Sequence, residues 1–243
     1  MEMAVIMIRL DKYLADMGVG TRAEVKKYIR QGKVKVDGLV VKSPEEKVDV
    51  ENQEVSYLDQ PVGYQSFEYY MLNKPAGVIS ATTDTKDKTV IDLITDKKRK
   101  DLFPVGRLDK DTEGLLLITN DGELAHRLLS PKKHVDKVYY AKVDGVLNEQ
   151  DVAALAQGIT LGDGLECLPA DLEPLGAGDE CLITLREGKY HQVKRMLASR
   201  EKPVLYLKRL SMGGLKLDES LEKGQWRPLT TEELKALREK QSK

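Results

Sequence analysis

The chain has 243 residues, of which 41% are hydrophobic and 33% are charged, a composition typical of a globular protein and not of a disordered or fibrous one. Its 39 basic and 40 acidic residues give a formal net charge of −1, so the overall charge neither favours nor excludes a nucleic-acid partner. The first residues, MEMAVIMIRLDKYL, hold only six consecutive apolar residues, which predicts neither a signal peptide nor a membrane span. Cys167 and Cys181 lack partners at metal-ligand spacing, so we expect buried free thiols in a cytoplasmic protein.

Residues 1–60 have the pattern of a small α/β domain. Leu10, Tyr13, Leu14 and Met17 share one face of a predicted helix. Thr21, followed three residues later by Glu24, is a capping-box signal that begins a second helix, and Gly32 ends it. Asp37–Gly38 then lies between two short alternating runs, which predicts a hairpin. The segment 61–66 has the composition of a linker, so a second domain is expected over 67–243.

The charge of the first domain is strongly asymmetric. Nine basic residues lie between positions 9 and 42, against four acidic ones. Several of the cations are three or four residues apart on the second predicted helix, where they share a face that continues into a basic hairpin. A solvated helix face is one interpretation, but this continuity favours a phosphate-binding surface. The candidate residues are Arg9, Lys12, Arg22, Lys26, Lys27, Arg30 and Lys33.

Strands outnumber helices in the second domain. Strands are expected on both sides of a turn at 73–77, at 115–119, 136–147 and 180–188, and as a pair over 204–217. Helices are expected at 89–94, 125–130, 148–159, 190–200 and 230–243, and the basic run at 97–100 is expected to be a solvated surface patch. Hairpin signals dominate over regular βαβ spacing, so the prediction is an α+β chain whose larger domain has a mixed, mainly antiparallel sheet.

Three carboxylates lie close together in GRLDKDTEGLLLITNDG, residues 106–122. A calcium loop that starts at Asp109 would need a bidentate glutamate at its twelfth position, where this chain has Asn120. An aspartic protease needs two Asp-Thr-Gly turns, and the chain offers only Asp111–Thr112 followed by Glu113. Glycoside hydrolysis by two carboxylates stays open, although one Trp and two Phe do not make an aromatic sugar platform.

Asp109 differs from its two acidic neighbours in its surroundings. Arg107 and Lys110 flank it, and their charges favour an ionised carboxylate at neutral pH. An apolar run also leads into it, which is typical of the edge of a site. We therefore expect Asp109 to take part in chemistry, and Asp111 and Glu113 to be turn and solvation residues.

The stretch 106–122 resembles the signature motif of pseudouridine synthases, in the branch that modifies ribosomal RNA. YMLNKPAGVIS (70–80) resembles the first motif of this branch, KVYYAKV (137–143) the strand with its active-site tyrosine, and REGKYHQVKRML (186–197) its third motif. Residues 8–60 resemble the RNA-binding domain named for ribosomal protein S-four. The spelling HQVKRM is close to that of the enzymes that act on the small subunit.

The resemblance implies a role for each matching residue. Asp109 would be the catalytic aspartate, Tyr139 would stack on the target base and help remove its C5 proton, and Lys194 would be the cation paired with the aspartate. Many members have arginine where this chain has Lys194, and strand alternation points Tyr140 away from Tyr139. No metal or other cofactor is implied. The implied RNA-binding residues are Arg107, Asn73, Lys74, His191 and Arg195, together with the seven cations of the first domain.

The resemblance implies an enzyme that isomerises uridine to pseudouridine, most closely in small-subunit (16S) ribosomal RNA. Two alternatives stay open: a large-subunit uridine as the target, and a non-catalytic RNA-binding factor in ribosome assembly. The flipped-out base that this chemistry needs would be held by the tyrosine and by basic side chains. We expect a cytoplasmic monomer, with no membrane contact, whose partner is ribosomal RNA within an assembling small subunit.

Overall fold

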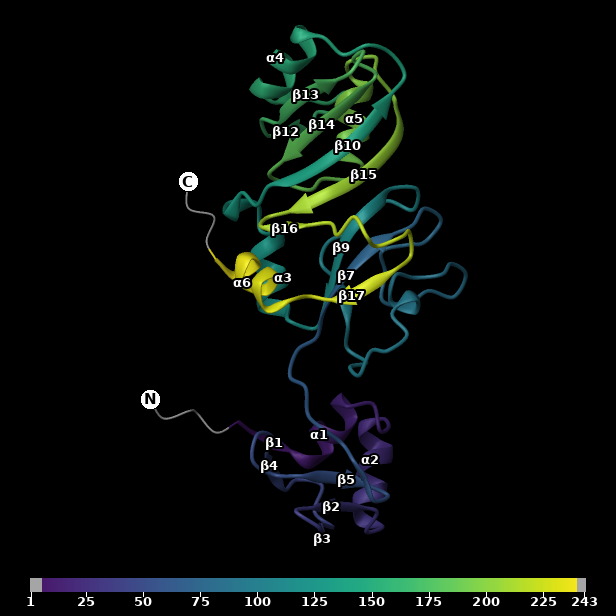
Figure 1. Ribbon diagram of the computed structural model, residues 1–243, viewed down its shortest axis with the longest axis vertical. Coiled ribbons are helices and arrows are strands. Elements are labelled where there is room, and N and C mark those ends of the chain that lie inside the picture. The colour runs from purple at the N-terminus through teal and green to yellow at the C-terminus, as the bar shows by residue number, and fades with distance from the viewer. Residues whose placement is uncertain (1–5, 240–243) are drawn as a thin grey trace. The chain divides into compact units, whose positions relative to one another are not determined.

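The chain folds as two units, each with its own sheet and core (Figure 1). The computed structural model describes residues 6–239. The small unit contains the residues up to 68 together with 96–102, and the large unit contains 69–95 and the chain from 103 onward. Residues 1–5 of the predicted first domain and 240–243 of the predicted last helix lie outside the described residues.

The small unit places two helices on short strands. Its elements are β1 (Met7–Arg9), α1 (Leu10–Asp16), α2 (Arg22–Arg30), β2 (Val34–Val36), β3 (Leu39–Val40), β4 (Lys47–Asp49), β5 (Val55–Tyr57) and β6 (Gln60–Pro61). β1 pairs with β4, and the other strands form a sheet in the order β3–β2–β5–β6. The capping box of Thr21 and Glu24 is present, and Asp37 and Gly38 have φ of 51° and 78° in the β2–β3 turn. The two predicted helices and the predicted hairpin are therefore confirmed.

The segment 96–102 was expected in the second domain, with a solvated patch at 97–100. In the structure it belongs to the small unit, and one of its basic residues is buried. Arg99 is 4% exposed, and its guanidinium bonds to Asp101 and lies 3.4 Å from a carboxylate oxygen of Asp16. Glu68 accepts hydrogen bonds from the backbone N–H groups of Lys98 and Arg99. A buried arginine is tolerated here because its charge is paired and its donors are used. The basic run thus anchors on the small unit through one of its four residues.

The large unit is built on a nine-stranded sheet. Its strands are β7 (Tyr69–Lys74), β8 (Phe103–Pro104), β9 (Glu113–Thr119), β10 (Lys137–Val143), β13 (Asp171–Leu175), β14 (Glu180–Leu185), β15 (Val204–Met212), β16 (Leu215–Lys216) and β17 (Trp226–Pro228). The order is β13–β14–β10–β15–β9–β7–β17, with β16 paired to β15 and β8 to β9. Among the described strands, only β15 and β9 pair in parallel. The predicted mixed, mainly antiparallel sheet is confirmed.

The parallel pair joins the two antiparallel parts of the sheet at Gly114, which lies in register with Arg209. Gly114 has φ of 98°, and a Cβ atom there would come within 2.8 Å of the backbone nitrogen of Arg209. Only glycine fits both this backbone conformation and this approach of two backbones. Every residue of β9 is buried, as expected from the uninterrupted apolar run after it begins.

The described residues of the large unit form four α-helices. They are α3 (Gly122–Leu129), α4 (Glu149–Gln157), α5 (Gln192–Ala198) and α6 (Thr231–Arg238), and two short 3-10 turns, η1 (Ile91–Leu93) and η2 (Pro131–Lys133), lie in connections. Leu124 and Leu128 of α3 and Leu237 of α6 pack with Leu115 and Leu117 of β9 in one core cluster. The helices expected from residues 148 and 230 begin with capping boxes at Asn148 and Thr230.

Two predictions for the large unit were wrong or incomplete. The strand expected after the 73–77 turn is reduced to one bridge between Ile79 and Thr89, and the helix expected at 89–94 is the single turn η1. The hairpin β11 (Ile159–Thr160) and β12 (Glu166–Cys167), as well as β8, β13 and β17, were not predicted. These strands are short or at sheet edges, where the alternating pattern has too few residues to be recognised.

Candidate active site

The loop from 106 to 112 carries the sequence motif and leads into β9. Ser80 fixes one side of it, because its Oγ donates to the carbonyl of Leu108 (2.9 Å) and accepts from the Leu108 N–H (3.0 Å). Within the loop, the N–H of Thr112 donates to the carbonyl of Asp109 at 3.1 Å. The N–H of Gly77, in the turn after β7, donates to the carbonyl of Lys110 at 2.7 Å. The loop backbone is therefore held by Gly77 and Ser80, which belong to one segment distant from it in sequence.

Lys74 is fully buried at the end of β7 and holds the same loop from inside. Its ammonium donates to the carbonyls of Asp109 (3.0 Å), Lys110 (3.3 Å) and Thr112 (2.9 Å), and to that of Pro75 (3.0 Å). Burial lowers the pKa of Lys74 to about 8, although nearby carboxylates act in the opposite direction. The neighbouring Asn73 is also buried, and its amide donates to the carbonyl of Leu221 at 2.8 Å.

These contacts correct the predicted role of Asn73 and Lys74, which the sequence analysis placed among the RNA-binding residues. Both side chains lie inside the large unit, where their donors meet backbone carbonyls. A buried, fully engaged ammonium is a structural clamp and cannot also reach a phosphate group. Their place in the first motif is therefore explained by the loop that they support.

Asp109 meets two cationic or ionisable side chains at the start of α5. Lys194 places its Nζ 3.3 Å from Asp109 Oδ2, and His191 places its Nε2 3.5 Å from Asp109 Oδ1. The Asp109 side chain is 25% exposed, so one part of the carboxylate faces a cation and another is open to solvent. α5 reaches this position because Val193, Met196 and Leu197 bury its opposite side. The predicted Asp109–Lys194 pair is present in the structure.

Asp111 lies in a turn and is exposed, as the sequence predicted, but it also contacts a cation. The Oδ1 of Asp111 lies 2.5 Å from the Nζ of Lys194, and this hydrogen bond lowers the pKa of Asp111. Burial alone would lower the pKa of Lys194, yet the two aspartates outweigh it and the pKa is raised, so Lys194 stays protonated. Asp111 is thus a second carboxylate on the same cation, which no local sequence signal could have indicated.

Glu113 is buried at the first position of β9. Its carboxylate accepts from the hydroxyl of Tyr206 (2.7 Å) and pairs with the ammonium of Lys223 (2.8 Å). Burial would raise its pKa, but these two partners outweigh that effect and lower it. The prediction of a solvation residue was wrong, because the parallel pairing of β9 with β15 brings Tyr206 over this position.

Tyr139 lies on β10, in register with Arg209 of β15, which is itself in register with Gly114 of β9. Neighbouring strands are about 4.8 Å apart, so Tyr139 is roughly two strand spacings from the point where the loop enters the sheet. Tyr139 is buried, whereas the half-buried Tyr140 contacts the ring of Tyr206 on the opposite face. Among the described residues, no hydrogen bond or ion pair connects Tyr139 with Asp109.

Comparison with known proteins matches residues 68–199 to the RNA pseudouridylate synthase family model and residues 8–55 to the S4 domain. An uncharacterized RNA pseudouridine synthase of Bacillus subtilis is 48% identical over 97% of this chain and 100% of its own length. The chain belongs to the RNA pseudouridylate synthase family. It is also 41% identical to ribosomal small subunit pseudouridine synthase A of Pseudomonas aeruginosa, over 93% of this chain and 99% of that protein.

A solved structure supports this family membership. A pseudouridylate synthase crystal structure shares 39% sequence identity with this chain, covers 95% of it and 99% of its own chain, and has a TM-score of 0.67. The pseudouridylate synthase match covers the loop with Asp109 as well as Tyr139 and Lys194, and the S4 match covers α1, α2 and the β2–β3 hairpin. The resemblance stated from the sequence is therefore confirmed.

The other candidate RNA-binding residues of the large unit have different surroundings. Arg107 is exposed at the start of the loop. His191 stacks on the ring of Tyr190 at a centroid distance of 3.8 Å, and its backbone has φ of 49°. Arg195 pairs with Asp163 at 2.6 Å. Two of these three side chains therefore already have partners within the large unit.

The candidate cations of the small unit fall into two groups. Arg9, Arg22 and Lys26 surround the carboxylate of Asp11, and Lys12 pairs with Asp16 at 2.7 Å. The other three candidates, Lys27, Arg30 and Lys33, are exposed, and Lys33 lies over the ring of Tyr28. The cations were identified from the sequence, and in the structure three of them contact the carboxylate of Asp11.

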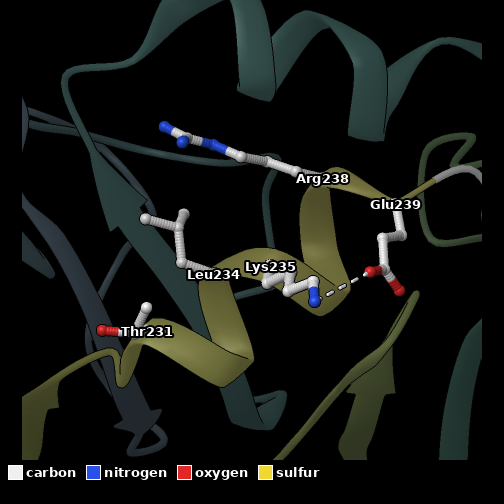
Figure 2. A pocket seen from close by; sticks show the side chains of 5 residues that line it. All are labelled: Thr231, Leu234, Lys235, Arg238 and Glu239. Carbon is white, nitrogen blue, oxygen red and sulfur yellow. Dashed lines mark ion pairs between the residues drawn. The ribbon is translucent and has the colours of Figure 1, made fainter.

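A hollow of about 380 Å³ lies along α6, lined by Thr231, Leu234, Lys235, Arg238 and Glu239 (Figure 2). None of the candidate site residues contributes to it, so it is separate from the carboxylate–lysine pair in its composition. In the part of the chain that the structure describes, no three His, Cys, Asp or Glu side chains could hold a metal ion. Among residues 6–239, no helix is long and apolar enough to cross a membrane.

Proposed function

We propose that this protein converts a uridine of small-subunit ribosomal RNA to pseudouridine, with Asp109 as the catalytic aspartate. The observation that carries the proposal is the contact of Asp109 with Lys194, at 3.3 Å, within a loop clamped by the buried Lys74. This arrangement places a cation beside the carboxylate and fixes its loop, while part of the carboxylate stays accessible. The relative from Pseudomonas aeruginosa, named for the small ribosomal subunit, supports the choice of substrate.

The reaction is an isomerisation, in which all atoms of the substrate are retained. The bond between C1′ and N1 breaks, the uracil turns, and a bond between C1′ and C5 forms, while a proton leaves C5 and another is gained at N1. Asp109 acts at the sugar, either by attacking C1′ or by removing the C2′ proton. In both routes the carboxylate must be ionised, and the ammonium of Lys194 lies 3.3 Å from it.

The target base must leave the RNA stack before this carboxylate can reach its sugar. We propose that Arg107, exposed at the start of the loop, takes the place of the extruded nucleotide. Tyr139 would then meet the uracil from the sheet, two strands away from Gly114. Stacking on an aromatic ring offsets part of the cost of unstacking, by about 1–3 kcal/mol.

In this proposal the two units have different functions. The S4 domain, with its exposed cations, would hold ribosomal RNA while the large unit carries out the chemistry; the small unit extends to residue 68, past the linker predicted at 61–66. We further propose that the protein acts as a monomer in the cytoplasm, on RNA within an assembling small subunit.

The test is to map pseudouridines by carbodiimide modification of ribosomal RNA from a strain that lacks this gene. We expect one small-subunit signal to disappear, to return with the wild-type gene, and to stay absent with Asp109→Asn. Loss of a large-subunit signal instead would contradict the substrate. An unchanged map would contradict the activity and favour a non-catalytic assembly factor.

A two-route test applies to the chemistry itself. RNA that carries deuterium at C2′ of the target uridine should react more slowly if Asp109 removes that proton. An unchanged rate would favour attack at C1′.

A further inference from the structure

Asp11 is a buried carboxylate in the middle of a basic surface. It is 0% exposed at the start of α1, yet three cations from two elements reach it. Arg9 donates from Nε (3.1 Å) and Nη2 (2.9 Å), Arg22 donates from Nη2 (3.3 Å), and the ammonium of Lys26 lies 3.7 Å away. Burial would raise the pKa of Asp11, but the hydrogen bonds and charges of the two arginines outweigh it and lower it.

The three cations are more exposed to solvent than Asp11, the acid that they all contact. The side chains of Arg9, Arg22 and Lys26 are 40%, 55% and 37% exposed, so each reaches inward to the carboxylate and outward to solvent. Asp11 engages one terminal nitrogen of Arg22, which leaves further N–H donors of the guanidinium for another acceptor. Three positive charges against one buried negative charge keep the cluster attractive to anions.

We propose that Asp11 is a positioning residue for RNA: it holds Arg9, Arg22 and Lys26 as a preformed cluster that binds phosphate groups of the RNA backbone. The inference rests on the proposed RNA substrate and concerns how the S4 domain holds it. Arginine and lysine side chains have many rotamers in solution, and binding an anion would restrict them. A carboxylate that already restricts them lowers this entropic penalty of RNA binding.

The proposal makes a prediction opposite to that of simple electrostatics. A carboxylate within a phosphate-binding surface repels phosphate, so its removal alone should strengthen RNA binding. If Asp11 organises the cluster, its removal should weaken binding, because the three cations lose their common anchor. The sign of the change therefore separates the two views.

The experiment measures binding of the full-length protein to a transcribed small-subunit ribosomal RNA over a range of salt concentrations. For Asp11→Asn we expect Kd to rise about tenfold, and the slope of log K against log salt to become shallower by about 0.7 to 1.5, which corresponds to the loss of one or two phosphate contacts. Under the proposed activity, KM should rise while kcat at saturating RNA stays unchanged.

A charge-matched control is Glu45→Gln. Glu45 also contacts Arg9, at 3.3 Å, but its side chain is 54% exposed, and among residues 6–239 it forms no ion pair with Arg22 or Lys26. Removing this negative charge should leave Kd unchanged or lower it by up to about twofold. An equal weakening by Glu45→Gln and Asp11→Asn would overturn a specific role of the buried acid.

A double-mutant cycle separates positioning from general damage to the fold. The variant Arg22→Gln/Lys26→Gln should weaken binding by about tenfold or more, and adding Asp11→Asn to it should change Kd by less than twofold. Additive effects would show that Asp11 acts independently of these cations and would overturn the proposal. If Asp11→Asn does not fold, the Arg22→Gln/Lys26→Gln variant still decides, because a wild-type Kd and salt slope would exclude a phosphate-binding cluster.

The proposed activity and this inference can fail separately. If the wild-type protein forms no pseudouridine in small-subunit RNA, the binding measurements still test Asp11 on the same transcript. If pseudouridine forms but Asp11→Asn binds RNA more tightly, the activity stands and the positioning role is wrong.

Discussion

The two units each contain an aspartate surrounded by cations, and the two arrangements differ in which partner faces the solvent. In the small unit Asp11 is buried and its cations are exposed. In the large unit Asp109 is a quarter exposed, and Lys194 is the cation that supports it from α5. A buried acid can serve only to arrange its cations, whereas a partly exposed acid can itself meet a substrate. The same type of ion pair thus exposes its cations to solvent in the small unit and part of its carboxylate in the large unit.

The largest expected effect comes from removing the exposed acid. Asp109→Asn keeps the shape of the side chain but removes the charge that acts at the sugar, so kcat should fall by about 10³-fold or more. RNA affinity should change by less than twofold, because the cationic surface of the small unit is untouched. Single-turnover kinetics and filter binding on the same RNA measure both. Substantial residual turnover would show that another carboxylate is used.

The cation of the large unit should be next in magnitude. Lys194→Gln removes the charge 3.3 Å from Asp109, and kcat should fall by about 10²-fold, as for loss of one preorganised electrostatic partner. Lys194→Arg should retain most of the activity, since it keeps the charge. The matched control is Asp111→Asn, which removes the other carboxylate on Lys194 and should change kcat by less than about fivefold. Equal losses for both variants would make Asp111 a full member of the catalytic group.

A substitution of Lys74 tests whether the activity of Asp109 depends on the buried ammonium that holds its loop. Lys74→Met fills the same space but removes the ammonium donor from the carbonyls of Asp109, Lys110 and Thr112, of which the first two keep a backbone N–H donor. Unsatisfied buried acceptors are costly, so the free energy of unfolding of the large unit should fall by about 2–3 kcal/mol and kcat should fall with it. Urea unfolding and turnover measure the two effects. A stable variant with wild-type kcat would show that the loop holds its shape without Lys74.

The smallest expected effect is a pH dependence of the small unit. The pKa of Asp11 in the folded protein is lower than its ordinary value of 3.8, so the unfolded chain binds more protons in this range. The stabilisation from ionised Asp11 is therefore complete well above pH 3.8 and is lost as pH falls through the lower folded value. Asp11→Asn should be less stable than wild type at pH 7, and this difference in the free energy of unfolding should narrow between pH 7 and pH 2. Thermal unfolding at both pH values measures this, and a constant gap would contradict it.

Local sequence signals predicted a large part of the fold. The capping box at Thr21, the Asp37–Gly38 turn and the cap at Asn148 involve residues within a few positions of one another, so their chemistry is visible in the sequence. The continuous apolar run after Glu113 likewise indicated a strand buried on both faces. The short edge strands and the single turn at 91–93 were missed or overestimated because few residues carry their pattern.

Site residues that belong to a sequence motif were predicted, whereas contacts that depend on the topology of the chain were missed. Asp109 and Lys194 lie 85 positions apart, and their pairing came from a resemblance to a family and not from their spacing. No pattern indicated that Asp111 would meet Lys194, that Glu113 would meet Tyr206, or that Arg99 would be buried in the small unit. The contacts of Asp111 and Glu113 join segments that are distant in sequence. The contacts of Arg99 place it in the small unit and not in the domain where it was expected.

By itself, the sequence determined the helices with their caps, the buried strand, the basic character of the first domain and the acid to be assigned to chemistry. These properties depend on side chains close together in the chain, or on motifs that specify a residue by position. Only the tertiary structure decided what the remaining acids do. The parallel pairing of β9 with β15 and the packing of α2 on α1 set which charges meet, and burial then decided whether an acid is enclosed by cations, as Asp11 is, or stays partly exposed, as Asp109 is.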